Sequence, residues 1–341
     1  MDDRAPDKDI LVIGAGLVGA MIAYQLANGG RHVAVVDAMK AGQSATRRAI
    51  GLATPLLSRE HIADTTRGVD ILTNLAVHLA VSPRACRVMH LASKPADTEA
   101  LHAMCDALPD NHRALAWIEG PGSLVPAGYT GGLVAQNSVQ IDLDVLTLHL
   151  LQHPNITLYE DIEILALNAN PGHLTAIAAG YSVRANAIVL ATNAYAGLLS
   201  PYLGDALHLV RSVTWTSKPL DSNQRLLELM LQAVPMPLVI DHGRLVLSQT
   251  RDWRLRIYAR KSTVRSDPAA AITDYLHEHL PELMAHSEDW CSGVTSTTPD
   301  SAPLVGRLAN DTLVLYALGA GMNGPAWAPI MAERIQQLVE G

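Results

Sequence analysis

The chain has 341 residues, of which 49% are hydrophobic and 17% charged, and its 25 basic and 33 acidic side chains give a net charge of −8. This composition excludes a disordered chain, a collagen-like chain and a basic nucleic-acid-binding protein. The length favours one large α/β domain or two interleaved lobes, with enough apolar residues for a sizeable core.

The sequence also bears on the setting of the protein. No run reaches the ~18 consecutive apolar residues that a bilayer-spanning helix needs, so no membrane segment is expected. The first nine residues carry four acids and do not have the pattern of a secretion signal. Cys86, Cys105 and Cys291 show no C-x-x-C spacing and no even count, which disfavours disulfides and a zinc site. We therefore expect a reducing, cytoplasmic setting and no metal.

The amino-terminal residues have the pattern of a β-α-β unit. Residues 10–13 are all apolar and end at a glycine, which is typical of a strand buried on both faces of a parallel sheet. Apolar residues then recur at three- and four-residue steps from Leu17 to Leu26, which predicts a helix. Residues 33–36 form the second strand, which ends at Asp37.

The turn between this first strand and the helix reads Gly14-Ala15-Gly16-Leu17-Val18-Gly19, a G-x-G-x-x-G motif in the strand-turn-helix context of a dinucleotide site. Gly14 permits the tight turn, Gly16 lets a pyrophosphate approach the backbone, and Gly19 allows the helix to pack closely on the strand. The amino end of the helix attracts the phosphate charge. Asp37 can accept hydrogen bonds from ribose hydroxyls and would repel a 2′-phosphate, which disfavours NADP. The motif alone does not separate FAD from NAD.

Beyond this unit the chain alternates between helical and strand patterns. Residues 43–57 mix small, polar and basic side chains and are expected to form a long functional loop, whereas residues 58–80 have a helical period. From 83 to 132 the pattern is irregular, and a second lobe is expected to begin there. Further predicted elements are a helix at 142–152, one or two strands at 155–167, a hairpin ending in the strand 187–190, antiparallel strands at 207–217, 238–240, 244–248 and 253–259 with a hairpin turn at 241–243, a helix at 268–284, a strand at 312–317 and a final helix whose start Pro329 could place beyond Pro325.

Five segments, in chain order, carry a further set of motifs. They are the glycine turn extended by Ala23 and Ala27, the stretch Ser44–Leu52, the strand Val189–Tyr195, the stretch Thr298–Gly306 and the loop Gly319–Gly324. Together they resemble the D-amino-acid oxidase superfamily of FAD-dependent oxidoreductases, in particular the glycine oxidase and sarcosine oxidase group, and the resemblance runs from Asp9 to the carboxyl terminus.

The resemblance implies an α/β fold in which a Rossmann-type FAD-binding domain is interleaved with a second, mainly antiparallel-sheet substrate domain. The expected division is 1–82, 140–205 and 290–341 for the FAD-binding domain, and 83–139 and 206–289 for the substrate domain. FAD is expected to be bound non-covalently, because Gly293 stands where sarcosine oxidases carry the flavin-linking cysteine. The residues implied to bind the cofactor are Gly14, Ala15, Gly16, Leu17, Val18, Gly19, Asp37, Ala38, Ser44, Thr46, Arg47, Arg48, Gly51, Leu52, Ile162, Ala191, Thr192, Gly321, Met322, Asn323 and Gly324.

Within this set, the glycine turn would hold the pyrophosphate, Asp37 the ribose and the backbone of Ile162 the adenine edge. The N–H groups of the loop Gly321–Gly324 would stabilise negative charge on the reduced flavin ring. Thr46, Arg47 and Arg48 would contact phosphate or flavin, although a solvated basic turn is an alternative interpretation of either arginine.

The activity that the resemblance implies is oxidation of a carbon–nitrogen bond of an amine or amino acid to an imine, by hydride transfer to flavin with oxygen as the expected acceptor. A fixed cation would help the reaction with oxygen, and Arg256 and Lys261 are the catalytic candidates, with a solvent-facing basic strand as the alternative. Arg211 and Tyr258 could line the substrate side of the sheet or be structural.

One departure from the family pattern concerns the substrate. Thr295 stands where glycine oxidases usually place an arginine that grips the substrate carboxylate. One alternative to a simple oxidase therefore stays open, a flavin-binding subunit of a larger complex with altered or lost activity. A second alternative, an NAD-dependent dehydrogenase, rests on the glycine turn, which FAD and NAD sites share. The expected partners are a small-molecule amine or amino acid, and a second copy or a partner subunit, with neither nucleic acid nor membrane.

Overall fold

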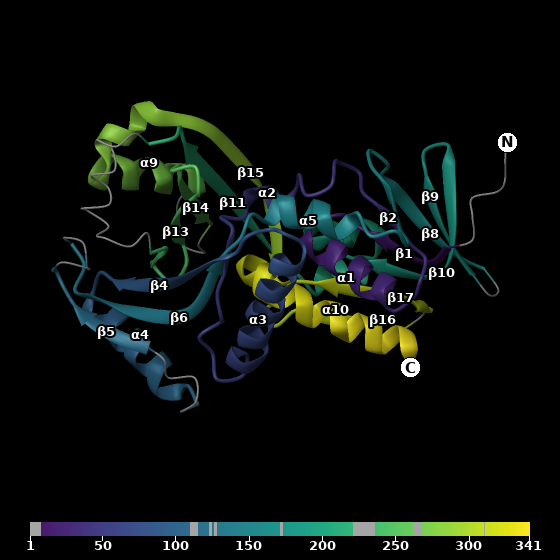
Figure 1. Cartoon of the computed structure of the whole chain (residues 1–341), viewed down its shortest axis with the longest axis horizontal. Helices are drawn as coiled ribbons and strands as arrows, with labels where there is room; N and C mark the ends of the chain where they lie inside the picture. Colours follow the sequence, from purple (N-terminus) through teal and green to yellow (C-terminus); the bar gives the residue numbers. More distant parts are fainter. Residues whose placement is uncertain are drawn as a thin grey trace.

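Two β-sheets, each at the centre of its own lobe, organise the molecule and lie side by side along its longest axis (Figure 1). The computed structural model describes residues 8–109, 115–122, 125, 128–170, 173–220, 236–261, 267–309 and 311–341. Within these residues no helix has both the length and the apolar character needed to cross a membrane.

The first sheet contains eight strands among the described residues, and the chain visits it from both ends of the sequence. Its main path follows β16 (Leu304–Leu308), β17 (Asp311–Leu318), β10 (Tyr181–Leu190), β1 (Lys8–Ile13), β2 (Val33–Val36) and β7 (Ile156–Tyr159), and β8 (Ile164–Asn170) and β9 (His173–Ala178) extend it from β10. The four strands β17, β10, β1 and β2 run parallel, as does β7. The buried apolar run 33–36 suits this position, because helices cover both faces of such a sheet.

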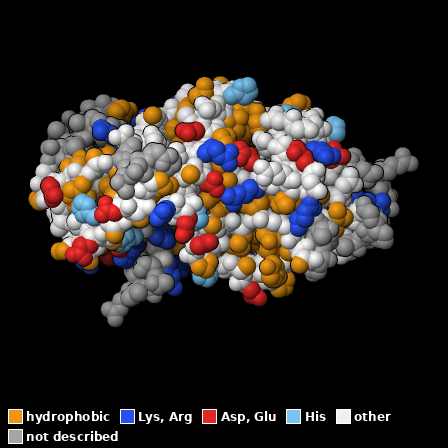
Figure 2. All heavy atoms as spheres, turned by 90° about the horizontal axis from the view of Figure 1, so that it is seen from below, with side chains coloured by type: hydrophobic (Ala, Val, Ile, Leu, Met, Phe, Trp, Pro, Cys, Tyr) orange, Lys and Arg blue, Asp and Glu red, His pale blue; other side chains and the backbone are white. Residues whose placement is uncertain are grey.

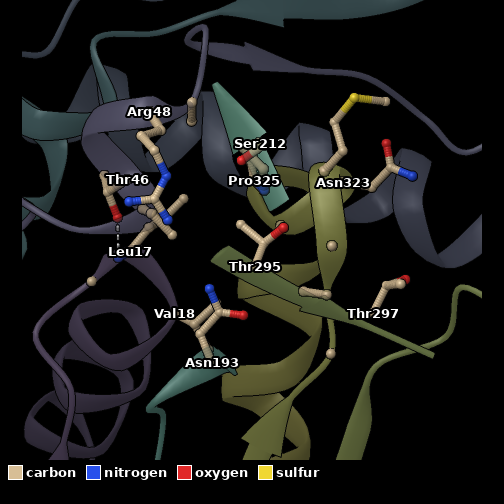
Figure 3. Close-up of a pocket in the computed structure, with 18 of the residues that line it drawn as sticks. Leu17, Val18, Thr46, Arg48, Asn193, Ser212, Thr295, Thr297, Asn323 and Pro325 are labelled. Carbon is tan, nitrogen blue, oxygen red and sulfur yellow. Dashed lines mark hydrogen bonds between the residues drawn. The ribbon is translucent and has the colours of Figure 1, made fainter. Parts of the chain in front are cut away.

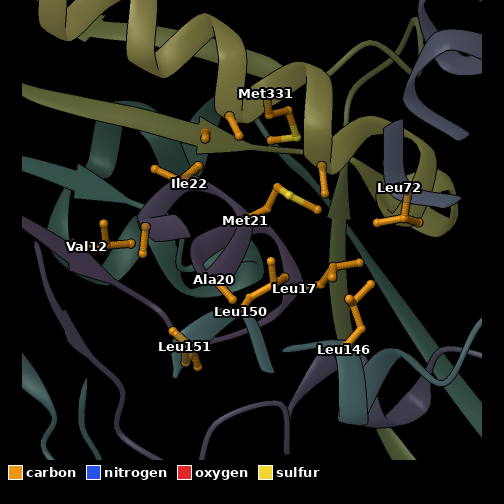
Figure 4. Close-up of a cluster of buried hydrophobic side chains, with 14 of the residues drawn as sticks. Val12, Leu17, Ala20, Met21, Ile22, Leu72, Leu146, Leu150, Leu151 and Met331 are labelled. Carbon is orange, nitrogen blue, oxygen red and sulfur yellow. The ribbon is translucent and has the colours of Figure 1, made fainter. Parts of the chain in front are cut away.

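Helices α1 (Leu17–Asn28), α3 (Ile62–His78), α5 (Leu143–Leu151) and α10 (Gly324–Glu340) pack together on this first lobe. Figure 4 shows their shared core, in which Met21 and Ile22 of α1 lie with Leu150 of α5 and Met331 of α10 in one cluster of buried side chains. Each such fully buried aliphatic side chain contributes about 2 kcal/mol. This core therefore fixes the start of α1, and with it the glycine turn, relative to the sheet.

The second sheet contains nine strands among the described residues and is antiparallel except where β12 pairs with β4. Its path follows β15 (Ser287–Thr297), β11 (His208–Ser217), β14 (Leu255–Arg260), β13 (Leu245–Gln249), β12 (Leu238–Ile240), β4 (Arg84–Ala92), β6 (Gly131–Gln140) and β3 (Leu52–Ala53), with β5 (Leu115–Glu119) beside β6. Helix α9 (Pro268–His279) covers one face, and α4 (Pro95–Ala107) lies beside β4 and β6. Short helices among the described residues are α2 (Ala45–Arg48), α6 (Ala196–Leu199), α7 (Pro201–Asp205), η2 (Asn193–Tyr195), η3 (Pro281–His286) and η4 (Gly321–Asn323).

The structure confirms the β-α-β unit and the hairpin turn at 241–243, and it differs from the sequence prediction at several places. The predicted loop at 43–57 contains α2 and β3, and the irregular stretch 83–132 contains β4, α4, β5 and the start of β6. Their pairing partners are far away in sequence, so the local pattern does not reveal them. Pro329 does not delay the last helix, which begins at Gly324 with Pro325 in its first turn.

Strand β15 links the two lobes. It pairs along its length with β11 in the second sheet, and Thr297 at its end forms a bridge with Ala320 in the loop that leaves the first sheet. Both β15 and β3 cross the predicted division of the chain, because β15 starts before residue 290 and β3 joins the second sheet from within 1–82. The domain boundaries remain a prediction.

Candidate active site

A cavity of about 760 Å³ extends from the glycine turn of the first lobe to the second sheet. Its walls come from the start of α1, from α2, from the end of β10, from strands of the second sheet and from the loop before α10 (Figure 3). Segments far apart in the sequence therefore meet at this one space, which is of the size expected for a ligand site.

At one end, the glycine turn leaves no room for side chains. Gly14 has φ +112°, a conformation that other residues rarely adopt, and a Cβ there would lie 2.6 Å from the carbonyl oxygen of Ala191. A Cβ at Gly19 would lie 1.8 Å from the carbonyl oxygen of Gly14, so α1 and β1 touch at this point. The turn thereby brings the amino end of α1 to the cavity, where its N–H groups favour negative charge.

Asp37 lies beside this turn and lines the cavity. One carboxylate oxygen accepts the N–H of Ala15 at 2.7 Å and the other accepts the N–H of Met39 at 2.8 Å. Burial raises the pKa of the Asp37 carboxyl above its usual range, although these two hydrogen bonds oppose the shift. The N–H of Ile162 donates to the backbone carbonyl of Asp37 at 2.9 Å, which holds the predicted adenine-binding segment next to the predicted ribose site.

Helix α2, in the predicted cofactor-binding stretch Ser44–Leu52, is hydrogen-bonded to the helix that follows the glycine turn. The N–H of Leu17 donates to Oγ1 of Thr46 at 3.0 Å (Figure 3), so α2 sits on the amino end of α1. The two arginines that follow differ. Arg47 is exposed, outside the cavity, and pairs with Asp289 at 3.4 Å, whereas Arg48 is only 5% exposed and lines the cavity. The solvated alternative therefore suits Arg47 and not Arg48.

Most of the remaining predicted cofactor residues line the same cavity. Gly16, Val18, Ala38, Ser44, Leu52, Ala191, Thr192, Gly321, Met322, Asn323 and Gly324 do so together with those described above. Ala15, Gly19 and Gly51 support the wall from behind, since Ala15 is fully buried and a Cβ at Gly51 would lie 2.7 Å from the carbonyl oxygen of Ile141. Oγ1 of Thr192 is buried without a hydrogen-bond partner in the described part of the chain.

At the other end, the second sheet forms the cavity floor. Because side chains alternate along a strand, one face carries Tyr258 and Arg260 of β14, Ser212 of β11 and Thr295 of β15, and all four line the cavity. Tyr258 is buried, which raises the pKa of its hydroxyl. Tyr258 and Thr295 were both predicted for the substrate side from the sequence.

Three other predicted residues lie outside the cavity. Arg256 shares the face of Tyr258, but its Nη2 donates to the carbonyl of Arg47 at 2.7 Å. Burial lowers the pKa of its guanidinium, and Asp144 is the charged group that most opposes this shift. Lys261, at the end of the strand, and Arg211, which alternates with Ser212, are exposed. Their catalytic and substrate-binding roles therefore remain predictions.

One further part of the cavity lining was not predicted from the sequence, and we call it the far compartment. It comprises Leu56, Leu91, Met104 and His90 of β4, and Nε2 of His90 is buried without a partner in the described part of the chain. Burial, together with the nearby His242, lowers the pKa of His90 to about 4. Nε2 of His242 lies 3.6 Å from Oδ1 of Asp97, and both residues also line the cavity. Only the pairing of β4 with β12 brings them together.

Comparison with known proteins places this cavity in context. Residues 9–338 match the family model described as DAO, FAD dependent oxidoreductase. The chain is 22% identical to glycine oxidase of Bacillus licheniformis, over 98% of this chain and 93% of that protein. It is also 22% identical to the tRNA 5-methylaminomethyl-2-thiouridine biosynthesis bifunctional protein MnmC of Psychrobacter sp. (strain PRwf-1), over 98% of this chain and 53% of that protein. The chain thus spans about half the length of this relative.

Among solved structures, glycine oxidase from Geobacillus kaustophilus superposes with a TM-score of 0.81 at 18% identity, over 98% of this chain and 95% of that one. This similarity confirms the predicted fold class, a mixed α/β fold with two interleaved sheets.

Proposed function

Because the chain belongs to the FAD-dependent oxidoreductase family, we propose that it oxidises a carbon–nitrogen bond of a small amine or amino acid to an imine, which water then hydrolyses. Bound FAD supplies the acceptor for the hydride, and oxygen is proposed as the final acceptor, giving hydrogen peroxide. Because the family is FAD-dependent, the alternative prediction of an NAD-dependent dehydrogenase was wrong.

The observation that supports this proposal is the continuity of the cavity from the glycine turn to the sheet floor. The described residues fit FAD: the turn exposes the amino end of α1, Asp37 offers a partly buried carboxylate, and Oγ1 of Thr192 is left without a partner in the described part of the chain. The far end is walled mainly by the second sheet, which leaves space for a substrate beyond the nucleotide.

The residues of this chain have separate tasks in the proposed reaction. The hydroxyl-bearing floor, with Ser212, Tyr258 and Thr295, orients the substrate, and orientation alone lowers the barrier of such a transfer. The apolar walls exclude water, which favours the neutral form of the substrate amine. The N–H groups at the start of α10 bring positive dipole to the cavity and stabilise negative charge there.

The purified protein tests the proposal directly. We expect a yellow protein that releases FAD on denaturation, since the cofactor is proposed to be held non-covalently. Anaerobic mixing with a panel of amines and amino acids should bleach the flavin with at least one of them, and readmitted oxygen should restore the colour with one equivalent of peroxide. A flavin that no member of the panel bleaches would contradict the proposal.

Thr295, in place of the family arginine, supports a second candidate function, in which the chain is a flavin-binding subunit of a larger complex. Stable co-purification with a partner, together with a flavin that no amine reduces, would favour it. For the predicted cation role, Arg256→Met or Lys261→Met should slow the reaction with oxygen more than flavin reduction, and equal loss in both steps would reject that role.

A further inference from the structure

Arg48 is a buried cation with little to balance it. Its Nη2 donates to the carbonyl of Val294 at 3.0 Å, while its Nε is buried without a hydrogen-bond partner, and no Asp or Glu of the described residues forms an ion pair with it. Its neighbour Arg47 pairs with Asp289 in the open. A buried, unpaired charge is strongly unfavourable, so a guanidinium kept in this state indicates a missing anion.

Gly293 leaves room for the side chain of Arg48. A Cβ at Gly293 would lie 2.3 Å from Cζ, 2.4 Å from Nη1 and 2.8 Å from Nε of Arg48, so the guanidinium rests directly on the backbone of β15. The φ of Gly293 lies outside the left-handed region, so its backbone does not require glycine. Because Gly293 has no side chain, the guanidinium of Arg48 can occupy the space above it.

The surroundings of this guanidinium suit a carboxylate. Oγ of Ser212, on the residue paired with Gly293, is buried without a partner in the described part of the chain. Oγ1 of Thr295, two residues further along the same face of β15, makes a long 3.4 Å contact with the carbonyl of Val210. The hydroxyl of Tyr258 lies beside both side chains and interacts with them. Figure 3 shows Arg48, Ser212 and Thr295 around the same part of the cavity. A guanidinium and two hydroxyl donors form a set that binds a carboxylate.

The cofactor phosphates have a different predicted place. The glycine turn, the amino end of α1 and Thr46 form the phosphate end, where Thr46 is already bonded to Leu17. Arg48 leaves that end and reaches the second sheet at Gly293 and Val294. The anion that it lacks is therefore better supplied by the substrate, which is expected over the sheet.

We propose that Arg48, lying in the space over Gly293, binds the carboxylate of the substrate with help from Ser212 and Thr295. This rests on the proposed function and deepens it: the substrate is an amino acid or another carboxylate-bearing amine. It also accounts for Thr295, because the arginine absent from that position is replaced by one from α2.

Binding of a carboxylate that cannot be oxidised tests this without turnover. The FAD-loaded protein is titrated with benzoate and with uncharged benzamide, and each Kd is read from the change in flavin absorbance. We expect Arg48→Met to weaken benzoate about 100-fold and leave benzamide within about twofold, since a charge-assisted pair is lost. Arg48→Lys, which keeps the charge but loses the fork, should weaken benzoate about 10-fold.

Two further variants make the test specific. Gly293→Ala keeps the arginine but pushes it off β15, and it should weaken benzoate about 10-fold as well. Arg67→Met removes an exposed arginine that pairs with Glu333 on the outer surface, and it should change neither Kd. FAD content is measured for every variant, and it should equal that of the wild type.

Three outcomes would overturn the proposal. Benzoate binding that is unchanged in Arg48→Met and Arg48→Lys places the carboxylate elsewhere, and a wild-type protein that binds benzamide as tightly as benzoate removes the need for an anchor. Loss of FAD from Arg48→Met assigns the anion to the cofactor. If no amine reduces the wild-type flavin and yet benzoate binding depends on Arg48, the proposed function fails and the carboxylate site stands.

Discussion

The two ends of the cavity are built in different ways. At the nucleotide end, neighbouring residues do the work: Gly14 and Gly19 touch through their backbones, and Asp37 accepts the N–H of Ala15. At the sheet end, Ser212, Tyr258 and Thr295 come from three strands that only long-range pairing brings together. Under the proposed function, the first end would bind the family's cofactor through backbone groups, whereas the second end could accept a different substrate after changes to single side chains.

The largest expected effect is at the nucleotide end. In Gly19→Ala, the added Cβ would lie 1.8 Å from a backbone oxygen that cannot move without opening the turn. We expect a loss of about 3 kcal/mol in the free energy of unfolding and no bound FAD. Denaturant unfolding and the flavin absorbance of the purified protein measure both.

Gly122→Ala is the matched control for this variant, because the nearest atom to its Cβ would be an oxygen at 3.8 Å. Stability and FAD content within error of the wild type are expected there. A Gly19→Ala protein that retains FAD would show that the close packing of α1 on β1 is not needed for the site.

The next effect, at the sheet end, depends on pH. The pKa of His90 in the folded protein is about 4, below its unfolded value of 6.5, so the unfolded state binds the proton more readily between these values. The free energy of unfolding should therefore fall as the pH drops from 6.5 to 4, with His90 contributing at most about 3 kcal/mol. The free energy of unfolding of the wild type and of His90→Leu, measured by denaturation at several pH values, isolates the contribution of His90. If the two free energies change with pH in the same way, the prediction is wrong.

A smaller effect is expected for Asp37→Asn, which keeps an oxygen for the N–H of Ala15 but removes the charge. FAD should bind about 10- to 100-fold more weakly, because a hydrogen bond to a charged group is lost. Burial raises the pKa of the Asp37 carboxyl, so wild-type affinity should fall on acidification sooner than that of the variant. Titration of the apoprotein with FAD at two pH values is the measurement, and equal affinities would remove Asp37 from the ribose site.

The smallest effect concerns the far compartment. Met104 lines the cavity, as His90 does, and Met104→Trp adds bulk to the lining without changing a residue of the floor. For substrates with a long apolar arm we expect KM to rise about 10-fold or less, while small substrates and kcat stay unchanged, since a single apolar contact is worth little more than this. Steady-state rates for a short and a long amino acid give the answer, and an equal effect on both would show that the arm does not reach this compartment.

What the sequence could predict follows the same division. The glycine turn, Asp37 and the loop Gly321–Gly324 could be predicted from local spacing, and the structure places Gly14, Gly16, Asp37 and this loop in the cavity lining. Tyr258 was identified from strand alternation, but alternation could not tell that Arg256, two residues earlier, is taken up by the carbonyl of Arg47. His90 and Ser212 carry no local signal, since their place in the cavity depends on which strands pair and in which register.

The pairing of β15 with β11 has a consequence for how this protein can vary. Residues of β15 alternate between the two faces, so a slip of one position would put the bulky Val294 beneath Arg48 and turn Gly293 and Thr295 outward. The pairing contains an irregularity between Thr216 and Ser217, at the opposite end from the cavity. We expect an inserted or deleted residue at that end to leave the register of the remaining pairs unchanged. The same change between Asp289 and Thr297 would shift the register and remove Gly293 and Thr295 from the face that lines the cavity.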